Sequence, residues 1–135
     1  MKGIADAGFI VAFGNRDDQY HSWAAALAMQ VTEPLLTCEA VLAEAAYQLS
    51  STSLIFNLLT DGLFRLSFNL EENIERVKQL ADSYEDRNPD LADLCIVRMS
   101  ELYPKHVVVT VDGDFRVYRR NKRDPIPLLL PPGRE

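Results

Sequence analysis

Two acidic residues stand alone in long stretches of uncharged sequence. Asp6 is the only charged residue in the segment 3–15, and Glu44 is the only charged residue in the segment 40–60. A carboxylate in apolar surroundings is costly to bury unless a cation or hydrogen-bond donors compensate its charge. The simpler alternative is that each lies on an exposed helix face or at a strand end. Their isolation makes Asp6 and Glu44 candidates for a functional site.

Other acids directly follow predicted strands. A short apolar run leads into Asp6, and the β-branched run at 107–111 leads into Asp112 and Asp114. In open parallel sheets, ligands bind at the carboxyl ends of the strands. If these two strands are neighbours, we expect their acids to converge in one crevice.

A third pair of acids lies in a predicted helix start. Asn88 is a favourable N-cap and Pro89 a favourable first helical residue. Asp90 and Asp93 are three residues apart and so share a face of this helix. Acids in a first turn also simply favour the helix dipole, which is the alternative explanation. Because the helix precedes the 107–111 strand, its first turn can lie at the same edge of the sheet.

Together these observations predict a metal site made of carboxylates. Converging carboxylates repel one another unless cations lie between them. Oxygen ligands without His or Cys suit Mg²⁺ or Mn²⁺ better than Zn²⁺, and such ions commonly act on phosphates. Asp90 and Asp114 are additional candidate metal ligands. The four candidate catalytic acids come from four separate elements: Asp6, Glu44, Asp93 and Asp112.

A basic cluster follows Asp114. It has three possible roles: an exposed, solvated surface, contact with substrate phosphates beside the metal site, or docking of an acidic partner. We select three of its arginines as candidate substrate-binding residues. The cluster consists of those three, Arg116, Arg119 and Arg120, together with Lys122 and Arg123.

Composition limits the class of protein. The chain has 135 residues and a net charge of −6, so a protein that merely coats nucleic acid, which is usually basic, is not expected. No apolar run approaches the about 20 residues that a membrane helix needs. Asp6 interrupts the amino-terminal apolar stretch, unlike in a secretion signal, and we expect a cytoplasmic protein.

Cys38 and Cys95 belong to no CxxC pair, which favours buried free thiols over structural zinc.

Motifs for other chemistries are missing. There is no GxSxG nucleophile motif and no GxxxxGK[ST] phosphate loop. Acyl hydrolysis and ordinary P-loop nucleotide hydrolysis are therefore not expected.

The predicted elements alternate between strand and helix. Such alternation is typical of an α/β fold with a doubly wound, mostly parallel sheet and helices on both faces, and we expect one domain over residues 1–135. Thr37 is the expected cap of the third helix. Strands are expected at 3–6, 33–36, 63–68, 107–111 and 126–130, and helices at 7–13, 17–30, 38–50, 54–60, 71–84 and 88–103.

The order of these motifs resembles the PIN (PilT amino-terminus) domain and, in its compactness, the toxin ribonucleases of the VapBC toxin–antitoxin type. The resemblance covers essentially the whole chain. Four segments carry it: IADAGFIVA at 4–12, LTCEAVLAEA at 36–45, DLADLC at 90–95 and VTVDGDF at 109–115.

The resemblance implies hydrolysis of RNA by a water molecule activated at one or two divalent metals. By position, Asp6 matches the first acid of the family and Glu44, rather than Glu39, the second. Asp93 matches the third, with Asp90 nearby, and Asp112 the fourth, with Asp114 nearby. Thr110 matches a small hydroxyl residue that often precedes the last acid.

The resemblance also implies partners. The expected substrate is RNA, the expected assembly is a homodimer, and the expected inhibitor is a small antitoxin protein that covers the cleft. The main alternative is a PIN-like scaffold that binds RNA or protein without cutting it.

Overall fold

A computed structural model describes all residues, 1–135. Its centre is a five-stranded sheet in the order β3-β2-β1-β4-β7, with every neighbouring pair parallel. The predicted fold class is therefore confirmed. The strands are β1 (Gly3–Ala5), β2 (Leu35–Thr37), β3 (Phe64–Leu66), β4 (Val107–Val109) and β7 (Leu128–Leu129).

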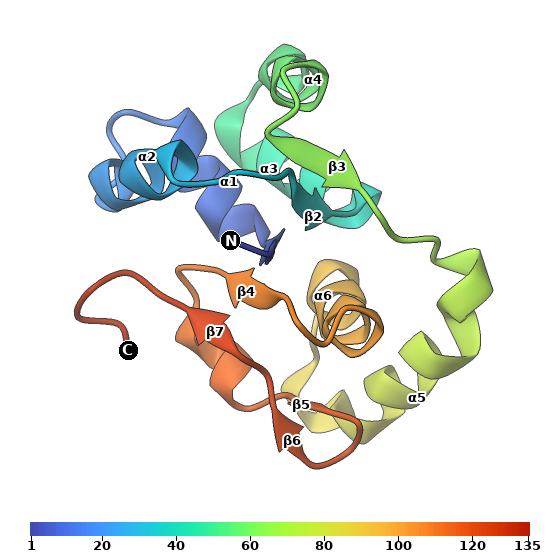
Figure 1. The fold of residues 1–135 in the computed structure, drawn as a ribbon. Helices are drawn as coiled ribbons and strands as arrows, with labels where there is room; N and C mark the ends of the chain where they lie inside the picture. Colours follow the sequence, from blue (N-terminus) through green and yellow to red (C-terminus); the bar gives the residue numbers. More distant parts are fainter.

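Helices cover both faces of this sheet. The connections from β1 to β2 and from β2 to β3 run in one direction across the sheet, and the connection from β3 to β4 runs back. This reversal places α1 to α4 on one face and α5 and α6 on the other. Figure 1 shows α1 and α2 across the sheet from α5 and α6. The helices are α1 (Ala7–Gly14), α2 (His21–Met29), α3 (Glu39–Leu49), α4 (Thr52–Thr60), α5 (Ile74–Ser83) and α6 (Leu91–Leu102).

The central strands β1 and β4 are neighbours, as the convergence of the acids requires. Ala5 is paired with Val109, the last residue of each strand. Both strands are almost wholly apolar, and Ile4 and Val108 are fully buried. The residues that follow each strand, Asp6 and Thr110, therefore emerge side by side at the carboxyl edge of the sheet.

One hydrophobic core surrounds the sheet. Phe9 of α1 lies at its centre and packs edge-on against Trp23 at 5.9 Å and Phe64 at 6.3 Å between ring centroids. The same contiguous cluster includes buried residues of both helical layers. None of the helices combines the length and the apolar character that crossing a membrane requires.

The predicted caps of two helices are wrong. Asn88 has left-handed backbone (φ 47°), and Asp90 caps α6 instead, its carboxylate accepting a hydrogen bond from the Asp93 amide at 2.8 Å. Thr37 belongs to β2, where its hydroxyl donates to the carbonyl of Ala5 at 3.2 Å, and Cys38 takes the cap position of α3. In each case, the residue that caps the helix lies one or two positions further along the chain than predicted. The helix expected from residue 17 begins only at His21.

The basic cluster contains a small ribbon that the sequence did not predict. β5 (Arg119–Arg120) pairs antiparallel with β6 (Asp124–Pro125), after the short helix η3 (Gly113–Arg116). Asn121 and Lys122 at its turn both have left-handed backbone, an uncommon conformation for lysine. With two residues per strand, no alternating pattern marks the ribbon in the sequence. Two further short helices are η1 (Glu71–Asn73) and η2 (Glu85–Arg87).

Candidate active site

Thr110 joins the acids that follow β1 and β4. Its hydroxyl donates a hydrogen bond to Oδ2 of Asp6 at 2.8 Å and accepts one from the Asp112 amide at 2.9 Å. The Asp6 amide in turn donates to the carbonyl of Val109 at 3.1 Å. Asp6 is only 6% exposed and Thr110 is fully buried. The position and orientation of the Asp6 carboxylate are therefore set by contacts with the end of β4.

Burial makes the charge on Asp6 costly. Loss of solvation, with smaller contributions from Glu44 and Asp112, raises the pKa of Asp6 from 3.8 to about 6. The hydrogen bond from Thr110 and the Ala7 amide act in the opposite direction and offset part of this rise. Asp6 thus interacts with carboxylates that come from α3 and from the end of β4.

Asp93 is perturbed still further. Burial, followed by repulsion from the other acids, raises the pKa of Asp93 from 3.8 to about 8. Glu44, which accepts a hydrogen bond from Gln48 at 3.2 Å, also has its pKa raised, first by burial and then by Asp90 and Asp112. These mutual effects define one group of acids, which we call the carboxylate cluster: Asp6, Glu44, Asp90, Asp93 and Asp112.

Two members of the carboxylate cluster also have a structural role. Asp90 caps α6 through the Asp93 amide, and Oδ1 of Asp112 accepts from the Asp114 amide at 2.8 Å at the start of η3. These bonds orient both carboxylates by local backbone geometry. Asp114 is exposed and lies at the margin of the cluster.

Tyr118 was not among the site residues predicted from the sequence. This tyrosine is 5% exposed and packs edge-on against Phe115 at 5.6 Å and Tyr84 at 5.0 Å between ring centroids. Burial, followed by repulsion from Asp93 and other nearby acids, raises the pKa of Tyr118 to about 12. Tyr118 is therefore a neutral neighbour of the carboxylate cluster. Its position within the basic cluster gave no signal for this role.

Arg120, predicted to bind substrate, has its guanidinium in contact with the protein. Nη1 of Arg120 donates to the carbonyls of Ser100 at 3.1 Å and Pro104 at 3.2 Å. These carbonyls belong to the carboxyl end of α6 and the turn after it, where a cation is favourable. The geometry thus favours a structural role for Arg120.

The other two candidate arginines also donate to backbone carbonyls. Nη1 of Arg119 donates to the carbonyls of Arg116 at 2.6 Å and Tyr118 at 3.0 Å. Arg116 follows the Asp112 cap of η3, is exposed, and donates to the carbonyl of Arg134 in the carboxyl-terminal tail. Arg134 also donates to the hydroxyl of Tyr20 at 2.6 Å, which attaches this tail to the start of α2.

The carboxylate cluster has the chemistry of a divalent-metal site. Its members supply only oxygen atoms, and a cation between them would relieve the repulsion that raises their pKa values. No three acidic, cysteine or histidine side chains are already arranged around a single ion position. Carboxylate oxygens alone are donors of the kind that hard divalent cations prefer.

Comparison with known protein families decides the classification. A family model described as PIN domain matches residues 4–121, a span that contains the whole carboxylate cluster. The chain belongs to the PIN domain family. PIN domains are generally metal-dependent nucleases that act on RNA or DNA. No curated protein sequence matches the chain.

The crowded acids of this PIN domain predict an unusual pH dependence of stability. Asp6 and Asp93 release their protons at about pH 6 and about pH 8 in the folded chain, but near 3.8 when unfolded. The folded state therefore binds more protons in this window, and the free energy of unfolding falls as pH rises. Because Asp93 is partly exposed, solvent screens the repulsion, and we expect the Tm of metal-free protein to fall by about 5 °C between pH 5 and pH 8.

Circular-dichroism melts in the presence of a chelator measure this effect. Asp93→Asn should remove most of the fall between pH 5 and pH 8 and raise the Tm at pH 8. Asp82→Asn, at an exposed position on α5, is the matched control and should follow the wild type. A Tm that stays constant or rises between pH 5 and pH 8 would show that the acids do not repel one another.

Proposed function

We propose that the chain is a ribonuclease that hydrolyses phosphodiester bonds of RNA at the carboxylate cluster, with Mg²⁺ or Mn²⁺. The observation that carries this proposal is the hydrogen-bonded arrangement in which Thr110 joins Asp6, after β1, to Asp112, beyond the neighbouring strand β4. Burial and repulsion between the acids, which raise the pKa of Asp6 and Asp93, support it. In this proposal Asp6, Glu44, Asp93 and Asp112 are catalytic metal ligands. Asp90 and Asp114 lie beside them as additional ligands.

The residues of the site have distinct tasks in this reaction. Thr110 donates a hydrogen bond to Oδ2 of Asp6 and so fixes the orientation of this carboxylate. Asp93, whose pKa of about 8 keeps it mostly protonated at neutral pH, must release its proton when a cation binds. A bound divalent cation would supply a water of lowered pKa and polarise the phosphoryl group. Arg116, exposed beyond Asp112, is positioned to contact substrate phosphate.

The biological setting follows from the resemblance described above. We propose that the chain is the toxin of a toxin–antitoxin pair, forms a homodimer, and is inhibited by an antitoxin protein that covers the carboxylate cluster. The order of the four motifs, which resembles that of the VapBC toxin ribonucleases, supports this assignment. Cys38 and Cys95 are free and buried, which suits a reducing compartment, and we expect the chain to act in the cytoplasm.

Incubation with RNA tests the proposed reaction directly. Purified protein and mixed cellular RNA, with Mg²⁺ or Mn²⁺, should yield discrete cleavage products that can be mapped by sequencing. A chelator should abolish cleavage and excess divalent ion should restore it, while single-stranded DNA in a parallel reaction tests the preference for RNA. Intact RNA under every divalent ion would favour the non-cleaving scaffold instead.

A further inference from the structure

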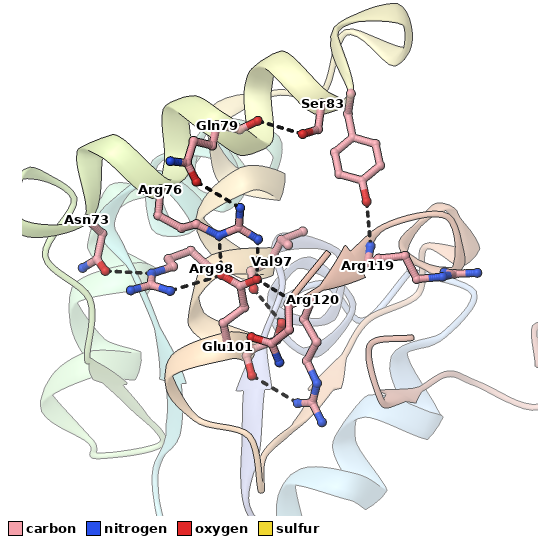
Figure 2. A network of polar contacts seen from close by, with 12 residues as sticks. Asn73, Arg76, Gln79, Ser83, Val97, Arg98, Glu101, Arg119 and Arg120 are labelled. Carbon is pink, nitrogen blue, oxygen red and sulfur yellow. Dashed lines mark hydrogen bonds and ion pairs between the residues drawn. The ribbon is translucent and has the colours of Figure 1, made fainter. Parts of the chain in front are cut away.

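A polar pocket lies apart from the carboxylate cluster, between α5 and the β5–β6 ribbon. It encloses about 470 Å³, and its walls include Arg76, Tyr84, Arg119 and Lys122. We call it the basic pocket. Figure 2 shows Arg76 and Gln79 on α5 facing the ribbon that carries Arg119 and Arg120. The proposed chemistry at the carboxylate cluster leaves this pocket unexplained.

One buried acid holds the wall of the basic pocket in place. Glu101 of α6, with a side chain only 2% exposed, accepts two hydrogen bonds from Arg76 at 2.9 and 2.6 Å and one from Arg98 at 3.2 Å. It also accepts the Asn121 amide of the ribbon turn at 2.6 Å. The guanidinium of Arg76 is therefore fixed in a defined orientation, and Figure 2 shows Glu101 between the two arginines.

The basic pocket has excess positive charge. Arg76, Arg119 and Lys122 are the basic residues of the pocket wall, and Glu101, which pairs with Arg76, also pairs with Arg98 outside the wall. Arg119 and Lys122 form no ion pair with any acid, and Asp82 is the one acidic residue of the pocket wall. A positive pocket in a chain of net charge −6 is a local feature that attracts anions.

The basic pocket adjoins the carboxylate cluster through two tyrosines. The hydroxyl of Tyr84, in the pocket wall, accepts a hydrogen bond from the Arg119 amide at 2.8 Å. The ring of Tyr84 packs edge-on against Tyr118, the buried neighbour of the carboxylate cluster, at 5.0 Å between centroids. The pocket and the cluster therefore lie on the two sides of one aromatic pair.

We propose that the basic pocket binds a backbone phosphate of the same single-stranded RNA, a short distance along the strand from the bond that is cleaved. This inference rests on the proposed function. Glu101 and Gln79 hold the planar guanidinium of Arg76 in the pocket wall, and a guanidinium is suited to phosphate. Arg119, hydrogen-bonded to the carbonyls of Arg116 and Tyr118, adds a fixed positive charge, and Lys122 adds a mobile one. A protein whose net charge repels RNA needs such a local contact to hold its substrate. The concave shape and the position beside the carboxylate cluster favour RNA over an acidic protein surface.

Binding of a labelled single-stranded RNA oligonucleotide, measured by fluorescence anisotropy with chelator present to prevent cleavage, tests the pocket. Lys122→Gln should weaken binding by about threefold to tenfold and reduce the slope of log K against log salt by about 0.7. Lys122 makes no hydrogen bond or ion pair, so folding should be unaffected. Lys105→Gln, at an exposed position between α6 and β4, makes the same change in charge away from the pocket and should bind as the wild type.

The outcomes separate this inference from the proposed function. If Lys122→Gln binds RNA more weakly but the wild type cleaves no RNA, RNA binding at the pocket would be supported and the ribonuclease activity rejected. Chelator-sensitive cleavage together with unchanged RNA binding by Lys122→Gln would support the ribonuclease and overturn the pocket.

Two competition measurements distinguish other anions. If inorganic phosphate binds the wild type as tightly as the oligonucleotide does, and Lys122→Gln weakens both equally, the pocket would be assigned to a free phosphate ligand. This result would overturn the RNA contact. If polyglutamate binds Lys122→Gln more weakly than the wild type while RNA binds both equally, the RNA contact would be overturned in favour of an acidic protein partner.

Discussion

Asp6→Asn is expected to reduce metal-dependent RNA cleavage by at least about a hundredfold. Loss of a residue that only hydrogen-bonds to a metal ligand already lowers activity by roughly 10–100-fold, and the loss of a ligand itself should cost more. Asparagine keeps an oxygen that can accept the hydrogen bond from Thr110, so the local geometry is retained. What is lost is the negative charge of the carboxylate cluster's most buried acid. Initial rates on a single RNA substrate, at saturating Mn²⁺ and Mg²⁺, measure the effect.

Stability measurements separate a chemical defect from a folding defect in this variant. In metal-free protein, Asp6→Asn should melt at or above the Tm of the wild type, because one repelling charge is removed. Asp17→Asn makes the same chemical change at an exposed position and should leave both cleavage and Tm unaltered. Cleavage by Asp6→Asn at the rate of the wild type would exclude this carboxylate from the reaction, and an earlier melt would contradict the crowding of the acids.

The largest loss of stability is expected for Glu101→Gln. Glutamine cannot neutralise Arg76 and Arg98, whose side chains are only 19% and 25% exposed. Removing one partner of a buried ion pair leaves the other charge uncompensated, and we expect a cost of about 3 kcal/mol, at the lower end of the usual range because the arginines keep some contact with water. This corresponds to a fall in Tm of about 10 °C, measurable by circular dichroism or calorimetry.

Glu75→Gln provides the matched control, since Glu75 is exposed on α5 and forms no ion pair. It should change the Tm by no more than about 1–2 °C. An equally small change for Glu101→Gln would mean that the network does not hold α5, α6 and the ribbon together.

We also expect Glu101 to make the stability of the protein depend on pH in acid. Burial by itself would raise its pKa, but hydrogen bonds from Arg76, the Asn121 amide and Arg98 outweigh burial, so the pKa of Glu101 lies below its ordinary value of 4.5. The stabilisation from this network is therefore present above about pH 4.5 and is lost as pH falls through the lower pKa of the folded state.

Much of the fold and of the carboxylate cluster could be predicted from the sequence alone. The β-branched run of β4 can only be a buried strand, and alternation of strands with helices leads to a parallel sheet. Asp6 follows β1 directly, as predicted, but β4 ends at Val109 and not at residue 111, so Thr110 and Val111 separate Asp112 from the strand. The family match over residues 4–121 confirms the PIN domain, while the toxin type within that family stays a prediction.

Contacts between distant parts of the chain decided the rest. Thr110 binds Asp6 across 104 positions, and Arg76 binds Glu101 across 25. Arg120 was predicted to face RNA, whereas the fold places its guanidinium at the end of α6. Tyr118 and the basic pocket likewise depend on how α5, α6 and the ribbon pack together. Residue type and spacing determine local structure and the ends of strands, but the partner of a side chain depends on which elements the core brings together.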